Sequence, residues 1–171
     1  MFLKNYAVTT NMKGNSHIGI SLEWKLNQSI RYSMPKLIPN LMKRLKHVPP
    51  IKLQHSPYPA PHIDHEMKTQ ALLPEDESPL LPEQSVKFIQ SMVGATLCLS
   101  RIIDSTLLVG HNTLSMQQTT GTTKTLSLAK FMLDCVSSNL NPSTTYCKFD
   151  MQLWIFSDVS YLSVSKSRSR V

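Results

Sequence analysis

Two short stretches near the start of the chain alternate apolar with polar residues. Every second position is apolar: Ile18, Ile20, Leu22 and Trp24 in the first stretch, then Ile30, Tyr32 and Met34 in the second. A period of two is typical of strands with one buried face, and the polar residues 25–28 indicate a turn. The pattern predicts a β-hairpin over residues 17–24 and 29–34. Because a hairpin alone is marginally stable in water, its apolar face must pack against something else.

The spacing of apolar residues becomes helical after Pro35. They recur three or four positions apart on one face: Ile38, Leu41, Met42 and Leu45. This spacing predicts an amphipathic helix from Pro35 to about His47, with Pro39 in its first turn. The basic residues of the segment fall outside the apolar stripe: Lys36, Lys43, Arg44 and Lys46. We therefore expect a helix with a cationic exposed face.

Three further helices are expected between residues 82 and 142. The first begins at Pro82 and Glu83 and runs to about Ile103. One inward face is predicted for Val86, Ile89, Val93 and Leu97, and Phe88, Met92 and Leu99 widen it. Residues that commonly cap helix N-termini mark the next two starts: Asp104 for a helix ending near Gln117, and Thr122 or Thr123 for one ending between Asn139 and Pro142. The apolar stripes of these helices predict a packed core.

Proline dominates the segment between the first helix and these three. Eight of the 11 prolines lie between positions 49 and 82. Because proline lacks the backbone N–H and favours extended neighbours, residues 48–81 predict a linker without a core of its own. Its acidic end, Glu75 to Glu77, precedes a helix start, where carboxylates suit the positive end of the helix dipole.

The last part of the chain predicts a second hairpin. Its strands are expected at Thr145 to Phe149 and Gln152 to Ser157, with a tight turn at Asp150 and Met151 and with Asp158 ending the second strand. Together the elements predict an α+β fold: a hairpin, a proline-rich linker, a helical bundle and a second hairpin.

Composition and charge narrow the class of partner. The 171 residues carry a net charge of +7, with 41% hydrophobic and 17% charged residues, which leaves room for one modest core. The charge is uneven, since residues 1–60 hold nine basic and one acidic residue while residues 61–110 hold three and seven. A basic surface favours a polyanion such as RNA or DNA. A solvated face that binds nothing in particular is the alternative.

Three cysteines, Cys98, Cys135 and Cys147, form no C-x-x-C pair. Their odd number and wide spacing argue against a disulfide framework or a disulfide-linked partner, and favour a reducing compartment, cytoplasmic or nuclear. The apolar neighbours of Cys98 and Cys135 predict buried thiols. No signal peptide is visible, and charged residues interrupt the longest apolar region, residues 92–109, so no membrane span is expected.

Patterns that carry chemistry are sparse. Asp158 follows the apolar run Leu153 to Phe156, as the first metal ligand does in several phosphoryl-transfer enzymes, although a solvated turn aspartate is the simpler interpretation. The chain has no Asp-Asp pair, no G-x-S-x-G and no phosphate-binding glycine loop. His62 and His65 are spaced as metal ligands but lie in the linker without a nearby cysteine.

The order of several segments adds a family resemblance. HIGISLEWKLNQSIRYSMPKLIPNLMKRL, from His17, resembles the end of the palm and the first thumb helix of retrotransposon reverse transcriptases. SPLLPEQSVKFIQSMVGATL, from Ser78, is similar to the helix after the linker in that family, and Asp104-Ser105-Thr106 to its next helix start. FSDVSYLSVSKSRSR, from Phe156, resembles the opening of the ribonuclease H domain in copia-type and related elements.

This resemblance implies a fragment of a polyprotein with four parts. Residues 1–47 would be the palm end with a primer-grip-like hairpin and the first thumb helix, 48–81 the linker, 82–142 a helical thumb or connection, and 143–171 the first strands of a ribonuclease H-like sheet. Asp158 would be the first metal-binding carboxylate, and Mg²⁺ the cofactor of the complete enzyme. The polymerase Asp-Asp pair and the remaining carboxylates are not in this chain. We therefore expect no cofactor and no catalysis from it alone, with the remainder of a polyprotein as a partner.

Two other interpretations remain. A small basic module would bind an RNA or DNA duplex through Lys36, Lys43, Arg44 and Lys46, with an affinity that falls steeply with salt. A decayed reading frame would have no function, would unfold with weak cooperativity, and would expose apolar hairpin faces.

Overall fold

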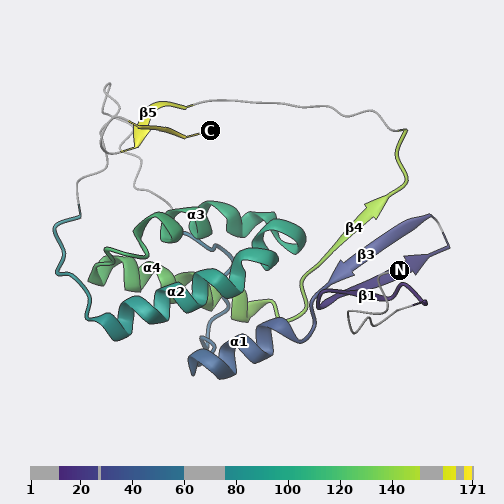
Figure 1. Ribbon diagram of the computed structural model, residues 1–171, viewed down its shortest axis with the longest axis horizontal. Coiled ribbons are helices and arrows are strands. Elements are labelled where there is room, and N and C mark those ends of the chain that lie inside the picture. The colour runs from purple at the N-terminus through teal and green to yellow at the C-terminus, as the bar shows by residue number, and fades with distance from the viewer. Residues whose placement is uncertain (1–11, 27, 60–75, 151–159, 165–167, 171) are drawn as a thin grey trace, which may run out of the picture.

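A computed structural model describes residues 12–26, 28–59, 76–150, 160–164 and 168–170 (Figure 1). Within these residues four α-helices form a bundle, and a four-stranded antiparallel sheet extends away from it. The predicted α+β class is confirmed at this level.

The sheet runs in the order β1 (Ser16–His17), β2 (Ile20–Lys25), β3 (Ser29–Ser33) and β4 (Ser143–Cys147). The predicted hairpin is present as β2 and β3, with Leu22 opposite Tyr32. The prediction of a single strand over residues 17–24 is wrong. Ile18 and Gly19, with φ of 47° and 79°, form a tight turn that folds β1 back onto β2. A two-residue hairpin turn with positive φ at both positions accounts for this break, and it leaves Ile18 84% exposed.

Only the first strand of the second predicted hairpin lies among the described residues. Thr145 to Cys147 belong to β4, which pairs antiparallel with β3, so that Arg31 faces Thr145. β2 occupies one edge of β3, and β4 satisfies the backbone groups of the other edge. The expected partner strand, 152–157, lies outside the described residues. A separate two-stranded sheet joins β5 (Ser160–Val164) to β6 (Arg168–Arg170).

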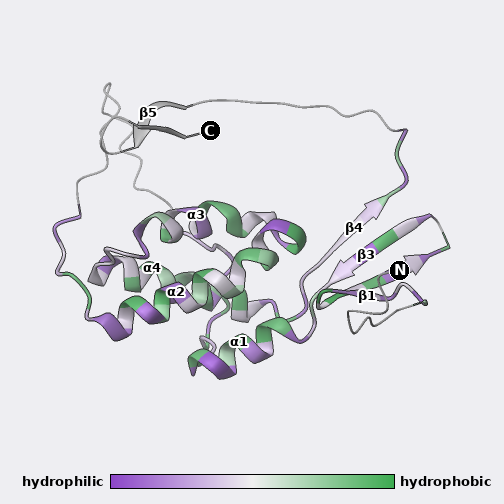
Figure 2. Cartoon of the chain, in the orientation of Figure 1, coloured by the Kyte–Doolittle hydropathy of each residue, from purple (hydrophilic) through white to green (hydrophobic). Residues whose placement is uncertain are grey.

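The first helix, α1 (Leu37–Leu45), follows β3 directly, as predicted. Its apolar stripe faces inward, with Ile38, Leu41 and Met42 buried. Figure 2 shows hydrophobic and hydrophilic bands alternating along α1. The helix ends at Lys46, whose φ of 51° turns the chain out of the helix while the N–H of His47 still bonds to the carbonyl of Met42 at 3.0 Å.

The helix starts predicted for residues 82–142 are confirmed. The bundle is built from α2 (Glu83–Cys98), which continues as the π-helical turn η2 (Leu99–Ile103), then from the 3₁₀ turn η3 (Ser105–Leu107), α3 (Leu108–Gln117) and α4 (Thr123–Ser138). The Asp104 side chain accepts from the Thr106 N–H at 3.1 Å and so caps η3. Thr122 caps α4 in a capping box with Thr125.

One core joins the helices to the near end of the sheet. Its centre is made of residues with almost no exposed surface: Ile38, Ile89, Met92, Leu99, Leu107, Leu114, Met132 and Leu133. The buried face of α2 and η2 includes Ile89, Met92, Val93 and Leu99, as predicted, but Leu97 is 37% exposed while Thr96 is buried. Ile20 and Tyr32 pack partly against this core, and the Thr144 hydroxyl donates to the carbonyl of Ile103 in η2. The sheet is therefore attached to the bundle at one end only.

The described part of the proline-rich segment is irregular but held to the bundle. Residues 48–59 contain no helix or strand, yet the N–H of Gln54 donates to the hydroxyl of Ser138 on α4 at 2.9 Å. Before α2, the N–H of Leu81 donates to the carbonyl of Gly121 at 2.9 Å, and Leu80 forms a β-bridge with Thr122. Residues 60–75, with His62 and His65, lie outside the described residues.

Candidate nucleic-acid interface

The basic residues predicted for α1 are found on its exposed side and at its C-terminal end. Lys36, Lys43, Arg44 and Lys46 are all exposed. At about 100° per helical residue, Lys36, Lys43 and Arg44 lie on the side away from the buried stripe. Lys46 follows the last helical residue, with φ of 51°. We call these four cations the basic face of α1.

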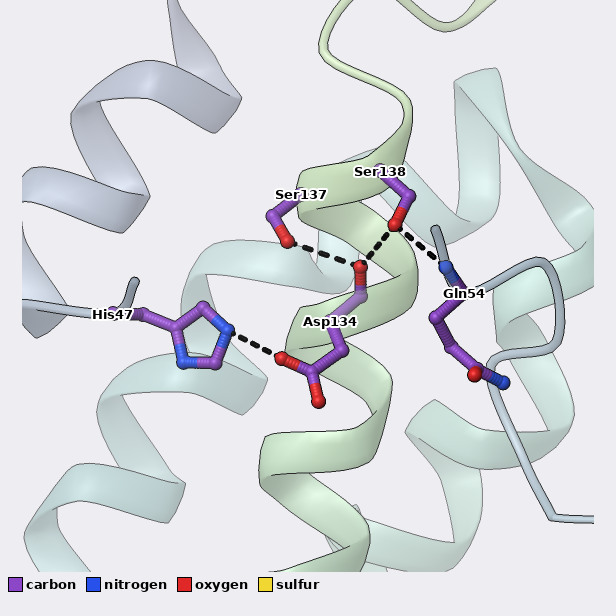
Figure 3. Close-up of polar contacts among 5 residues, drawn as sticks. All are labelled: His47, Gln54, Asp134, Ser137 and Ser138. Carbon is purple, nitrogen blue, oxygen red and sulfur yellow. Dashed lines mark hydrogen bonds and ion pairs between the residues drawn. The ribbon is translucent and has the colours of Figure 1, made fainter. Parts of the chain in front are cut away.

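This face has a fixed orientation because α1 is anchored on both sides. The guanidinium Nη2 of Arg44 donates to the carbonyl of Ser91 on α2 at 3.1 Å. Just beyond α1, the ring Nε2 of His47 lies 2.8 Å from the carboxylate Oδ1 of Asp134 on α4 (Figure 3). The hydroxyls of Ser137 and Ser138 donate to the Asp134 carbonyl at 3.0 and 2.7 Å. The end of α1 is thus tied to both neighbouring helices.

No carboxylate compensates the basic face among the described residues. The ion pairs within the described ranges join Glu23 to Arg31, Asp134 to His47 and Glu83 to Lys87. The segment from residue 34 to residue 59 contains no Asp or Glu at all. Positive charge that is exposed and uncompensated attracts phosphate groups and releases their counterions on binding.

A purely structural role explains only part of this charge. Lys43 and Arg44 lie in the last turn of α1, where cations interact favourably with the carbonyl end of the helix dipole. Lys36 precedes the first turn, where the dipole disfavours a cation. Stabilisation of the helix therefore does not account for Lys36.

Metal and thiol chemistry find little support in the described part of the chain. No group of three His, Cys, Asp or Glu side chains among the described residues is arranged to hold a metal ion, and Asp158 lies outside these residues.

The prediction of a buried thiol is wrong for Cys98, which is exposed at the end of α2, whereas Cys135 is half-buried. Burial raises the pKa of the Cys135 thiol and the Asp104 carboxylate raises it further, so this cysteine is a poor nucleophile. All three cysteines are free.

The tertiary structure also brings together residues that the sequence did not connect. Trp24 on β2 and Tyr146 on β4 lie on one face of the sheet, at the end remote from the bundle. The pairing of β3 with β4 spans more than 100 positions, and no local pattern signals it. The proximity of His47 and Asp134, 87 positions apart, is equally invisible in the sequence.

Comparison with protein-family models, with curated proteins and with solved structures gives no match for this chain. One helical stretch among the described residues, Glu83–Ile103, is long and apolar enough to cross a membrane. Ile89, Met92 and Leu99 within it form the centre of the core, and the core helix of a folded domain passes the same test.

Proposed function

We propose that this chain is part of a retrotransposon reverse transcriptase–ribonuclease H polyprotein, and that its own contribution is to hold the phosphate backbone of a nucleic-acid duplex. The basic face of α1 carries this proposal. Four exposed cations on an anchored helix, without a carboxylate partner among the described residues, suit a regular row of phosphates. Contacts of this kind supply affinity and position without reading sequence.

The order of the segments supports the family assignment. A hairpin that leads directly into a basic helix, followed by an irregular proline-rich stretch and a helical bundle, is the arrangement expected from the resemblance. The finer part of the proposal assigns residues 143–171 to the opening of a ribonuclease H-like sheet. There Asp158 would be the first metal-binding carboxylate once further carboxylates are supplied.

The proposal places catalysis in the complete polyprotein, with Mg²⁺ as its cofactor, and not in this chain. A two-metal site requires several carboxylates around one pair of ions. Magnesium-dependent nuclease activity of this chain that is lost in Asp158→Ala would refute this part of the proposal.

The test of the basic face is the salt dependence of duplex binding. Fluorescence anisotropy of a labelled 20-base-pair duplex would be measured at several salt concentrations for the full chain and for Lys36→Gln/Lys43→Gln. Both lysines are exposed, so we expect the packing of α1 to remain intact when they are replaced. Because each lost phosphate contact lowers the slope of log K against log salt by about 0.9, we expect the slope to fall by about two.

The matched control is Lys124→Gln/Lys130→Gln on α4, which removes the same charge from two other exposed lysines. If the control lowers the slope as much as the α1 variant does, binding depends on net charge and not on the basic face. Absence of duplex binding at low salt would contradict the proposal outright.

A further inference from the structure

The end of the sheet remote from the bundle exposes two aromatic rings on one face. In the strand register Trp24 faces Ile30, and Ile30 faces Tyr146, so these three side chains form one row across β2, β3 and β4. Trp24 is 68% exposed and Tyr146 51%. With strands about 4.8 Å apart, the two rings originate about 10 Å from each other. We call this row of Trp24, Ile30 and Tyr146 the ring face.

Both rings are held in place although they are exposed. The indole Nε1 of Trp24 donates to the carbonyl of Gly14 at 3.0 Å. The Tyr146 ring meets the Tyr32 ring edge-on, with centroids 5.1 Å apart and planes at 69°, and Tyr32 in turn packs against the core. A ring that is already oriented loses little conformational freedom when a planar partner stacks on it.

The charge around the ring face selects the partner. Lys148 lies two residues beyond Tyr146, where its N–H donates to the carbonyl of Gln28 at 3.2 Å. This lysine is exposed. Glu23 and Lys25 alternate onto the opposite face of β2, where Glu23 pairs with Arg31 at 3.8 Å. Aromatic rings with a cation beside them suit a ligand that has flat bases and a phosphate backbone.

We propose that the ring face binds single-stranded nucleic acid, with one base stacked on Trp24 and another on Tyr146. Bases in a duplex are already stacked on one another and cannot lie on the rings, so the ligand must be unpaired. Sheets whose exposed aromatic residues stack successive bases recur among RNA-binding domains. The site is distinct from the basic face of α1 and does not depend on duplex binding there.

Trp24 itself can report the stacking. The chain has two tryptophans, and Trp154→Phe leaves Trp24 as the only one. The fluorescence of this variant would be titrated with a 12-nucleotide oligothymidylate, at a salt concentration high enough to suppress contacts made by phosphate alone. We expect saturable quenching, because a stacked base lies directly on the indole. An abasic strand of equal length, which keeps the phosphates and lacks the bases, is expected to cause none.

A second variant tests the other ring. Tyr146→Leu in the same background keeps an apolar side chain but removes the ring, and we expect it to weaken binding about tenfold. Tyr58→Leu is the matched control, because Tyr58 lies in the segment after α1 and outside the sheet, and it is expected to leave the affinity unchanged. The abasic comparison needs no change in the ring face, so it remains decisive if Tyr146→Leu does not fold.

Three results would overturn the proposal. They are equal quenching by the abasic strand, no effect of Tyr146→Leu in a folded variant, and a concentration-dependent shift of Trp24 emission without nucleic acid, which would mean that a second copy covers the rings. Lys36→Gln/Lys43→Gln is expected to leave the quenching at high salt intact. Failure of the basic face can therefore be told apart from failure of the ring face.

Discussion

At the scale of single residues, Thr122 connects the start of α4 to the segment that precedes α2. Its hydroxyl accepts from the N–H of Thr125 at 3.2 Å and donates to the Asp76 carboxylate. Asp76 also accepts from the N–H of Ser78 at 3.0 Å and from its hydroxyl. The position of Asp76 before a helix suggested a role at the start of α2, but its carboxylate is used at the start of α4.

These bonds make stability depend on pH in a definite direction. The hydrogen bonds from Ser78 and Thr122 lower the pKa of Asp76 below its ordinary value of 3.8. Because the folded pKa is lower than the unfolded one, the stabilisation is fully present above pH 3.8 and is lost as the pH falls through the folded value. Asp76 is exposed, so solvent screening limits the effect to less than about 1 kcal/mol.

Asp76→Asn is therefore expected to lower the melting temperature by about 2 °C at neutral pH, and by progressively less as the pH falls below 3.8. Thermal unfolding followed by circular dichroism at neutral pH and at a series of acidic pH values measures the difference. Glu77→Gln removes a neighbouring exposed carboxylate that makes no described hydrogen bond, and it serves as the control. An equal loss at every pH would show that ionisation of Asp76 contributes nothing.

At the scale of elements, the segment after α1 is attached to α3 and α4 at three points. His47 contacts Asp134, Gln54 contacts Ser138, and the carbonyl oxygen of Pro57 lies against Gly110 of α3. A Cβ at position 110 would lie 3.2 Å from that oxygen, closer than ordinary van der Waals contact. Glycine leaves room here for the backbone of another segment, which passes close to the helix.

Two glycine substitutions test this packing. Gly94→Ala on α2 adds a methyl group with nothing within 4 Å, so we expect about 0.5–1 kcal/mol of stabilisation from helix propensity. Gly110→Ala has the same helical preference but must displace a backbone carbonyl, and we expect it to be less stable than Gly94→Ala by about 1 kcal/mol or more. Urea unfolding of both variants measures the difference. Equal stabilisation would mean that the segment does not pack on α3.

At the scale of the whole molecule, the four-stranded sheet joins segments from before and after the helical bundle. β4 follows the helical bundle in sequence but pairs with β3, which precedes it. Residues 143–147 therefore complete a sheet that begins at Ser16, whereas the predicted domain boundary at 143 treats them as the start of another unit.

Two truncated chains test whether residues 143–147 belong to this sheet or begin a separate unit. A chain ending at residue 142 leaves β3 as an exposed edge and removes the contact between Tyr146 and Tyr32, whereas a chain ending at residue 150 retains both. With about 0.5–1.5 kcal/mol for each lost hydrogen bond, we expect the shorter chain to be less stable by on the order of 2–3 kcal/mol in denaturant unfolding. Equal stability of the two would support a separate unit that begins at 143.

Much of the fold could be predicted because it depends on local interactions. Asp104 and Thr122 cap helices through hydrogen bonds to residues two and three positions away, and the buried stripe of α1 repeats within nine residues. The candidate site was predictable to the same extent, since a regular helix with a fixed apolar side leaves its cations on the other side. The exposure of Cys98 and Leu97 was missed, because packing partners decide which of two apolar sides of a helix is covered.

The four helices, the β2–β3 hairpin and the basic face of α1 follow from the sequence, because capping, alternation and helical spacing act between residues a few positions apart. Three features follow from tertiary contacts instead: β4 joins β3, Trp24 and Tyr146 share one face, and His47 and Gln54 reach α4. These contacts join residues more than 80 positions apart. Their free energy comes from burying surface and satisfying backbone groups between distant segments, and the spacing of residues along the chain carries no record of either.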